Sequence, residues 1–466
     1  MPSPSQAQSD TQSGPCHISR LPNELLAEIV ETAAAWPDNA DRYVFHDLYT
    51  DRWAMTLVCR RFHLLAMPAL YSTIILGDII EPPFPELLHG AIHTSVHRKA
   101  MLLLHRSVKK KRSLGLMCTE LVFDLRTSAV DIGSMLLDVA ADLVSWFKNA
   151  RSLRIREVPG CCRPSAYSSC LSAACTKMPR LERLALDEMP GEAVLTTLRD
   201  SISSSIRELK LTGLSKSGSD GAARWNRLRV KAPLPIRRGP FTELWIRDFQ
   251  DWPDSFRQLM SWPEKLERFT LFGISRYGYH HLDLQSVWGC LVPHALSLES
   301  IRIGSISNQY ASLSRVLAAV DFNPFQRLTF LSLSYWATGS GEGETNLLAP
   351  NLQTFEWTFD AQDQRQLYLD DFQQQEEDFL RKLAKAAIAR KVPLRKILIT
   401  KFDPEVSTRR SIERAANPAL MAGLEIPLEY PWDRMGRVAG ELLPLGIQLL
   451  YNKPTITKEE FDAARC

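Results

Sequence analysis

The sequence lacks a long apolar run and a secretory signal. Its first fifteen residues are rich in Ser, Gln and Pro and contain no apolar segment of the kind that such a signal requires. No apolar stretch reaches the length of about 18 residues that a membrane-spanning helix needs. We therefore expect no membrane partner. We also expect a disordered tail over residues 1–16, because so polar a segment buries too little apolar surface to become ordered.

Cysteine is scarce, with nine residues in a chain of 466. An odd number without a secretory signal indicates free thiols in a reducing compartment, and so a protein of the cytoplasm, the nucleus or both. One group lies close together in the sequence: Cys161, Cys162, Cys170 and Cys175. Zinc sites usually contain two closely spaced Cys pairs or histidines, and this group has no histidine and no such set of two pairs. We therefore interpret its members as buried or loop thiols rather than zinc ligands.

An excess of either charge is also missing. Against 56 Lys and Arg residues stand 53 Asp and Glu residues, for a net charge of +3. Such a balance excludes a dedicated nucleic-acid-binding protein and leaves room only for local basic patches. We interpret one short basic run, from Lys109 to Arg112, as the solvated end of a helix, with a nuclear localisation patch as the alternative.

Motifs of catalysis and phosphate binding are absent. The sequence contains no G-x-S-x-G, H-E-x-x-H or P-loop pattern, and its Gly-rich stretch at residues 339–344 carries two glutamates that disfavour a phosphate. His89, His93 and His97 share one helical face, but no carboxylate or cysteine completes a metal site there. We therefore expect a non-catalytic protein without cofactor or metal, and a surface loop at residues 339–344.

Two amphipathic segments lie near the N-terminus. Leu25, Leu26 and Ile29 fall on one side of a predicted first helix. A second helical run is predicted over residues 53–71, with an interruption at Pro68.

The two segments together resemble an F-box of the fungal type. The first contains Leu21-Pro22-Asn23-Glu24-Leu25-Leu26 and the second contains Val58-Cys59-Arg60-Arg61-Phe62, which match the two motifs of that family in order. The resemblance implies a small all-α module at residues 17–76 that docks onto a Skp-family adaptor and through it onto a cullin. The adaptor-binding residues that it implies are Leu21, Pro22, Leu25, Leu26, Ile29, Val58, Cys59 and Phe62.

The link between the two motifs, at residues 31–52, is longer than in compact F-boxes. It either loops out or forms an added helix. An ordinary helical hairpin that caps the rest of the chain is the alternative interpretation of this region. A unit of about 60 residues has only a marginal core of its own, so burial of its apolar face against a partner fits the F-box interpretation.

A short template, apolar-x-x-apolar-x-apolar, recurs along most of the chain, and strict alternation over such short runs predicts β-strands. Amphipathic helical segments lie between the copies, for example at residues 131–147, 313–320 and 376–391. This alternation predicts parallel strands joined by right-handed crossovers. The fourth template positions are Leu121, Leu153, Leu184, Leu209, Leu244, Phe269, Ile301, Leu331, Phe355 and Ile397.

Template and period resemble leucine-rich repeats in the irregular form found in F-box proteins. The resemblance implies an α/β solenoid of about ten repeats with parallel strands and one shared core, at residues 118–452. A helical linker or first cap is expected at 77–117, an atypical last repeat near 434–452, and a polar, fraying tail at 453–466. The rival is a doubly wound α/β enzyme, which the uniform template and the lack of a phosphate loop disfavour.

Residues that alternate with the buried strand positions are expected to face the concave side of the solenoid. We predict that some of these form a basic ridge with two aromatic anchors, suited to an acidic or phosphorylated target segment. Exposed strand positions offset by neighbours such as Glu208 and Glu243 are the alternative. The candidate substrate-binding residues are Arg154, Arg156, Lys210, Trp245, Arg247, Phe272 and Arg302.

Both resemblances together imply the substrate-recognition subunit of an SCF-type ubiquitin ligase, which acts by holding a target protein near the ubiquitin-carrying enzyme. The alternatives are a non-degradative interaction scaffold and a solenoid that binds partners alone, beside a vestigial F-box.

Overall fold

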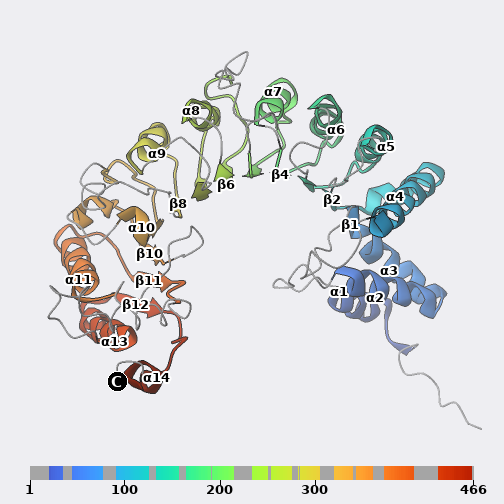
Figure 1. The fold of residues 1–466 in the computed structure, drawn as a ribbon. Helices are drawn as coiled ribbons and strands as arrows, with labels where there is room; N and C mark the ends of the chain where they lie inside the picture. The colour runs from blue at the N-terminus through green and yellow to red at the C-terminus, as the bar shows by residue number, and fades with distance from the viewer. Residues whose placement is uncertain are drawn as a thin grey trace, which may run out of the picture.

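The structure is a computed structural model in which a long curved sheet carries helices along its outer side (Figure 1). Three N-terminal helices lie at one end of the arc and the short helix α14 at the other. The residues described are 20–34, 45–76, 91–124, 133–156, 164–189, 191–214, 234–249, 253–274, 282, 284–304, 320–338, 343–359, 372–403 and 429–463.

The N-terminal helices form a small module. They are α1 (Asn23–Ala34), α2 (Phe45–Val58) and α3 (Arg60–Ser72). Both α1 and α2 pack on α3. Helix α4 (Ala91–Lys110) and the 3₁₀ helix η3 (Arg112–Met117) then connect the module to the first helix of the outer layer.

All twelve strands of the sheet are parallel and follow one another in sequence order, from β1 to β12. An order without any exchange means that each strand pairs only with its neighbours along the chain, as in a solenoid. The strands are β1 (Thr73–Leu76), β2 (Glu120–Asp124), β3 (Ser152–Arg156), β4 (Arg183–Asp187), β5 (Glu208–Thr212), β6 (Glu243–Phe249), β7 (Arg268–Ile274), β8 (Ser300–Ile303), β9 (Phe330–Ser334), β10 (Thr354–Thr358), β11 (Lys396–Thr400) and β12 (Gln448–Tyr451).

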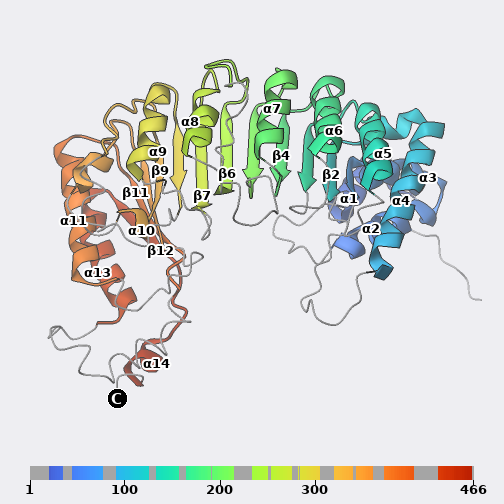
Figure 2. The same cartoon turned by 45° about the horizontal axis from the view of Figure 1, so that its top comes forward.

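Helices cover the outer side of the sheet, and the strands beneath them run in one direction (Figure 2). The described helices beyond η3 are α5 (Gly133–Trp146), α6 (Pro164–Lys177), α7 (Gly191–Ser201), α8 (Pro253–Ser261), α9 (Leu284–Leu291), η4 (Val292–His294), α10 (Tyr335–Thr338), η7 (Glu344–Leu347), α11 (Gln374–Ala389), α13 (Pro431–Leu442), η9 (Leu443–Leu445) and α14 (Lys458–Ala463).

One continuous core lies between the sheet and this helical layer. The template residues Leu153, Leu184, Leu209 and Leu244 are directly paired across β3 to β6, and all are at most 1% exposed. Residues between the buried positions point to the other side of the sheet, which is the inner side of the arc. The same alternation therefore builds the core and a separate concave face.

The strand predictions are confirmed. All ten predicted fourth positions lie in β2 to β11, and the predicted last repeat at 434–452 contains β12. The sequence missed β1, whose Thr-Ile-Ile-Leu run lacks the template. This strand pairs with β2, so it belongs to the same sheet although it lies within residues 17–76.

Predicted helices appear as α5 and α11, and α13 lies at the start of the predicted last repeat, but several details differ. The run over residues 53–71 is two helices that break at Cys59, and α3 continues through Pro68. Ile388, which lies in the predicted amphipathic segment 376–391, is 48% exposed. Residues 313–319 of another predicted helix lie outside the described part of the chain.

The C-terminal end of the arc is closed by charged and aromatic contacts. Glu377 of α11 binds Arg434 and Arg437 of α13, which joins the two helices. The predicted polar tail contains α14, and its Phe461 is buried against Tyr430. Part of the predicted polar tail is therefore packed against the rest of the chain, because one aromatic side chain anchors the short helix α14.

Candidate functional site

Two arginines tie α1 to its neighbours. Arg52 of α2 is buried and donates two hydrogen bonds, of 3.0 and 2.6 Å, to the carbonyl of Ala34 at the end of α1. Arg61 of α3 donates to the side chain of Asn23 at 2.6 Å and to the carbonyl of Leu21. Both ends of α1 are thereby fixed, and the two sequence motifs meet in space.

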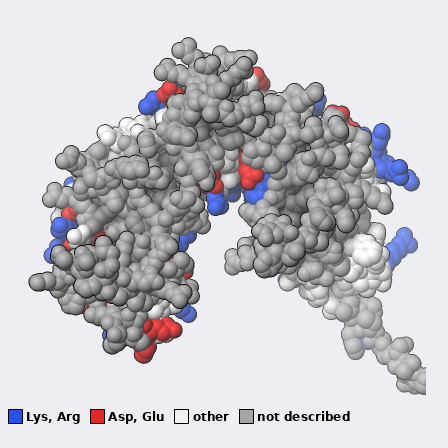
Figure 3. All heavy atoms as spheres, viewed as in Figure 1, with Lys and Arg blue, Asp and Glu red and all other residues white. Residues whose placement is uncertain are grey.

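Large apolar side chains remain exposed on this module, at 47% to 67% of their surface. Helix α1 contributes an i, i+4 pair, and α2 contributes another such pair, so each helix presents one apolar stripe. Figure 3 draws the visible described part of the module mostly as uncharged side chains. We call these six exposed side chains together the apolar face: Leu25, Ile29, Trp53, Leu57, Val58 and Leu64.

The predicted adaptor-binding residues divide between this face and the interior. Leu25, Ile29 and Val58 belong to the apolar face, and Pro22 is exposed beside it in the chain. Leu26, however, is fully buried and packs inside the module instead of presenting a surface.

The remaining predicted residues hold the α2–α3 corner and the start of α1. Cys59 is the exposed N-cap of α3, and its sulfur accepts a hydrogen bond of 3.5 Å from the backbone N–H of Phe62. The Phe62 and Leu21 side chains are only partly exposed. Trp53, Leu57 and Leu64 are not among the predicted site residues, although the i, i+4 spacing of the first two would have indicated a shared helical face.

The concave face carries the predicted substrate-binding residues in two rows defined by strand pairing. One row joins Arg154, Ala185, Lys210, Trp245, Thr270 and Arg302 across β3 to β8. The next joins Arg156, Asp187, Thr212, Arg247 and Phe272 across β3 to β7. The structure therefore brings all seven candidates onto one side of the sheet.

Acidic side chains lie among these cations. The carboxylate of Asp187 is 2.5 Å from Nε of Arg154 and 3.7 Å from Nε of Arg156. Lys210 pairs with Glu208 at 2.6 Å and Arg247 with Asp248 at 3.4 Å. Figure 3 shows basic and acidic atoms side by side at the inner edge of the arc. The face is consequently mixed in charge, with some cations better paired than others.

Three buried thiols sit in the core. Burial raises the pKa of Cys118 and of Cys170 to about 12, and that of Cys175 to about 11. These residues stay protonated at neutral pH, which suits core packing and not metal binding. Cys161 and Cys162 lie outside the described residues, among which no group of three potential metal ligands occurs.

The basic run ends a helix, as its composition predicts. Lys109 and Lys110 are the last residues of α4 and are exposed. The guanidinium of Arg112 lies 3.9 Å from the ring centre of Trp146. Of the three spaced histidines, His89 lies outside the described residues, as do the side chains of His93 and His97.

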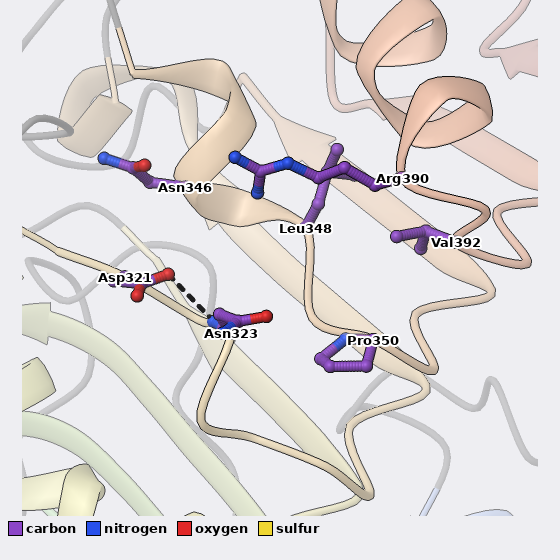
Figure 4. A pocket seen from close by; sticks show the side chains of 7 residues that line it. All are labelled: Asp321, Asn323, Asn346, Leu348, Pro350, Arg390 and Val392. Carbon is purple, nitrogen blue, oxygen red and sulfur yellow. Dashed lines mark hydrogen bonds between the residues drawn. The ribbon is translucent and has the colours of Figure 1, made fainter.

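A pocket of about 460 Å³ opens among the loops that lead into β9, β10 and β11 (Figure 4). Charged, polar and apolar residues line it: Asp321, Asn323, Asn346, Leu348, Pro350, Arg390 and Val392. Asp321 accepts a 2.9 Å hydrogen bond from the backbone N–H of Asn323, and Arg390 donates to the carbonyl of Thr345. These polar groups serve the local loops, so the pocket offers no assembled catalytic group.

Among the helices of the described chain, none combines the length and apolar character needed to span a bilayer. The surfaces that remain as candidates are the apolar face and the concave face. No protein-family model matches the chain, and no curated protein is significantly similar to it.

Proposed function

We propose that this protein is the substrate-recognition subunit of an SCF-type ubiquitin ligase. In this proposal, α1 to α3 form an F-box that docks onto a Skp-family adaptor, and the leucine-rich-repeat-like solenoid holds a target protein. The protein performs no covalent chemistry itself. Its contribution is proximity, because it raises the effective concentration of target lysines near the ubiquitin-carrying enzyme.

The observation that carries the proposal is the apolar face. Six large apolar side chains on three short helices are about half exposed or more. Full burial of one such side chain stabilises by about 1.5–3 kcal/mol, so that a partner covering this face gains several kcal/mol. A gathering of exposed apolar residues on a small module is typical of a protein-binding surface.

The contacts of Arg61 support the resemblance on which the proposal depends. This residue belongs to the second motif and binds Leu21 and Asn23 of the first. Two sequence motifs separated by a long link are therefore joined by hydrogen bonds in one helical unit.

The position of the concave face fits a receptor with two separate binding surfaces. The apolar face lies at the N-terminal end of the arc, and the candidate target-binding residues lie along β3 to β8. A partner on one surface leaves the other open. Such separation allows an adaptor and a target to be held at the same time.

Co-purification with a Skp-family adaptor tests the proposal. We expect the Leu25→Asp/Ile29→Asp variant to lose the adaptor, because two carboxylates would have to be buried in an apolar contact. Leu443→Asp is the matched control, since Leu443 is 65% exposed at the far end of the chain. Equal recovery of the adaptor with both variants would refute the F-box assignment.

The alternative is a non-degradative scaffold that uses the adaptor without directing ubiquitination. Blocking the cullin in cells separates the two functions. A degradation receptor accumulates its bound target when the cullin is inactive, whereas the amount of a scaffold's partner does not change.

A further inference from the structure

The centre of the concave face carries two aromatic side chains in contact. Trp245 on β6 and Phe272 on β7 lie diagonally across the paired strands, in neighbouring rows. Their ring centres are 6.3 Å apart with an interplanar angle of 60°, and both residues are partly exposed. We call this pair the aromatic platform. Aromatic side chains of this kind commonly anchor peptide and protein ligands.

The next strand leaves room for the platform. Gly304 follows β8, and a Cβ atom there would lie only 2.6 Å from Cδ1 of Phe272. The Phe272 ring therefore extends over the glycine backbone. A residue with a side chain at position 304 would therefore displace the ring, so glycine at this position allows the platform to form.

Four basic side chains surround the platform. Lys210 is paired in register with Trp245, Arg247 with Phe272, and Arg302 lies two strands from Trp245 in the same row. The fourth, Lys401, follows β11, and its Nζ is 5.9 Å from the Phe272 ring centre. Four strand spacings cover about 19 Å on a flat sheet, so curvature of the arc brings Lys401 to this ring. We call Lys210, Arg247, Arg302 and Lys401 the surrounding cations.

Two of these cations form only long ion pairs. Arg247 is 3.4 Å from Asp248, and Arg302 is 3.8 Å from Glu356. The guanidinium of Arg302 also lies 4.5 Å from the ring centre of Phe330. The arginine side chains are 43% and 45% exposed. The ion pair of Arg247 with the 46% exposed Asp248 contributes little to stability, so a ligand anion can replace that carboxylate at small cost. Glu356 is only 14% exposed and also accepts a hydrogen bond from Thr400, so a ligand anion would join it beside Arg302 and not displace it.

The inward-facing rows of β3 to β8 carry seven basic side chains and three acidic ones. This excess attracts an anionic ligand, but the interleaved carboxylates would repel the unbroken charge of a nucleic-acid backbone. The basic residues are Arg154, Arg156, Arg183, Lys210, Arg247, Arg268 and Arg302, and the acidic ones are Asp187, Glu208 and Glu243.

We propose that the concave face binds an extended acidic peptide segment. An aromatic or aliphatic side chain of the segment packs on the aromatic platform, and carboxylate or phosphate groups on either side of it pair with the surrounding cations. This inference names the target class for the proposed receptor and rests on that function for its biological meaning. Its geometry is independent of the adaptor-binding module.

The test uses the full chain and a dye-labelled synthetic peptide with a central phenylalanine flanked by aspartates and glutamates. Fluorescence anisotropy measures its binding to Lys210→Glu/Arg302→Glu and to Arg257→Glu/Lys385→Glu. The second variant makes the same change in net charge on exposed positions of α8 and α11. We expect binding to weaken at least about tenfold, or about 1.4 kcal/mol, in the first variant only.

Further arms test each part of the inference. A peptide with phosphoserines in place of the acids distinguishes the two sources of negative charge, and binding of either one supports the proposal. Equal affinity of both protein variants would overturn it, as would equal affinity for a peptide of reversed charge. A peptide with glycine in place of its phenylalanine is expected to bind more weakly, and undiminished binding would overturn the role of the platform.

Two controls distinguish binding of an acidic peptide from binding of a nucleic acid and from binding of the adaptor. Tighter binding of a single-stranded oligonucleotide than of the peptide, lost in Lys210→Glu/Arg302→Glu, would replace the peptide with a nucleic acid and overturn the proposal. Adaptor binding is measured on the same variant and is expected to be unchanged. Loss of the adaptor by Leu25→Asp/Ile29→Asp with normal peptide binding shows that the two surfaces act independently.

Discussion

Glu377 accepts a 2.9 Å hydrogen bond from Arg434 although the two side chains are only 1% and 5% exposed. The same carboxylate also binds Arg381 and Arg437, each at 2.7 Å. One buried anion thus serves three guanidinium groups where α11 packs against α13. An end cap of a solenoid depends on such local contacts, because it has a neighbour on one side only.

Replacement of this anion is expected to loosen the C-terminal end. Glu377→Gln leaves the buried guanidinium of Arg434 with less compensation and should cost about 3 kcal/mol. Glu441→Gln, which removes a 43% exposed partner of Arg381, should cost less than about 1 kcal/mol. Hydrogen–deuterium exchange of α13 and β12 measures the difference. Equal protection in the two variants would contradict the assigned role.

The close contact between Gly304 and Phe272 predicts a second effect. Gly304→Ala must displace the aromatic ring, so we expect a loss of about 1–3 kcal/mol in unfolding free energy together with weaker binding of the acidic peptide. Gly289→Ala on α9 is the control, because nothing lies within 4 Å of its new Cβ atom. That variant should be stabilised by about 0.5–1 kcal/mol through helix propensity. Urea unfolding and peptide titration check both expectations.

His294 predicts a dependence of stability on pH. Burial lowers its pKa below the ordinary value of 6.5, and a neighbouring Arg237 acts in the same direction. Its Nε2 donates a 2.8 Å hydrogen bond to the carbonyl of Met260, which opposes this lowering of the pKa without reversing it. When the pH falls below 6.5, the histidine takes up a proton more readily in the unfolded chain than in the folded chain. The contribution of His294 to the unfolding free energy is therefore complete above pH 6.5, and it decreases as the pH falls towards the pKa of the folded state.

We therefore expect the wild-type unfolding free energy to fall more between pH 7 and pH 5 than that of His294→Gln. The glutamine keeps an N–H donor and removes the titrating group. Thermal unfolding across this range compares the two proteins, and parallel pH profiles would show that His294 does not contribute.

Two adjacent leucines of α1 are expected to behave differently. Leu26→Ala removes a fully buried side chain and should cost about 2–5 kcal/mol of stability. Leu25→Ala changes a residue that is 47% exposed, so it should leave stability nearly unchanged and weaken the adaptor contact. Thermal unfolding and adaptor binding measured on both variants check this division. If both variants lost the same amount of stability, the conclusion that Leu26 is buried and Leu25 is not would be wrong.

Much of the sheet could be predicted because its signal is local. Alternating residues such as Leu184 and Leu186 are both essentially buried in β4, and their pattern depends on two positions in one strand. Helical segments between the predicted strands then favour parallel strands that follow one another in sequence order. β1 was missed because its four residues carry no template, and because its partner β2 follows only after α4 and η3.

The candidate sites depended on contacts that no single segment contains. The break at Cys59 arises from a sulfur cap on α3, while Pro68 is tolerated within that helix. Whether Leu25 or Leu26 faces inward depends on how α1 packs on α3, and the pairing of Arg154 with Asp187 depends on two strands. The sequence pattern therefore predicted two groups of candidate residues, but it could not predict which of their side chains are buried or paired.

The most direct test of the central claim is calorimetric titration of the purified full chain with a purified Skp-family adaptor. Covering the apolar face predicts a saturable one-to-one complex with a negative heat-capacity change, and a much weaker complex for Leu57→Asp. A wild-type chain that does not bind the adaptor, or a Leu57→Asp variant that binds it with equal affinity, would contradict the account.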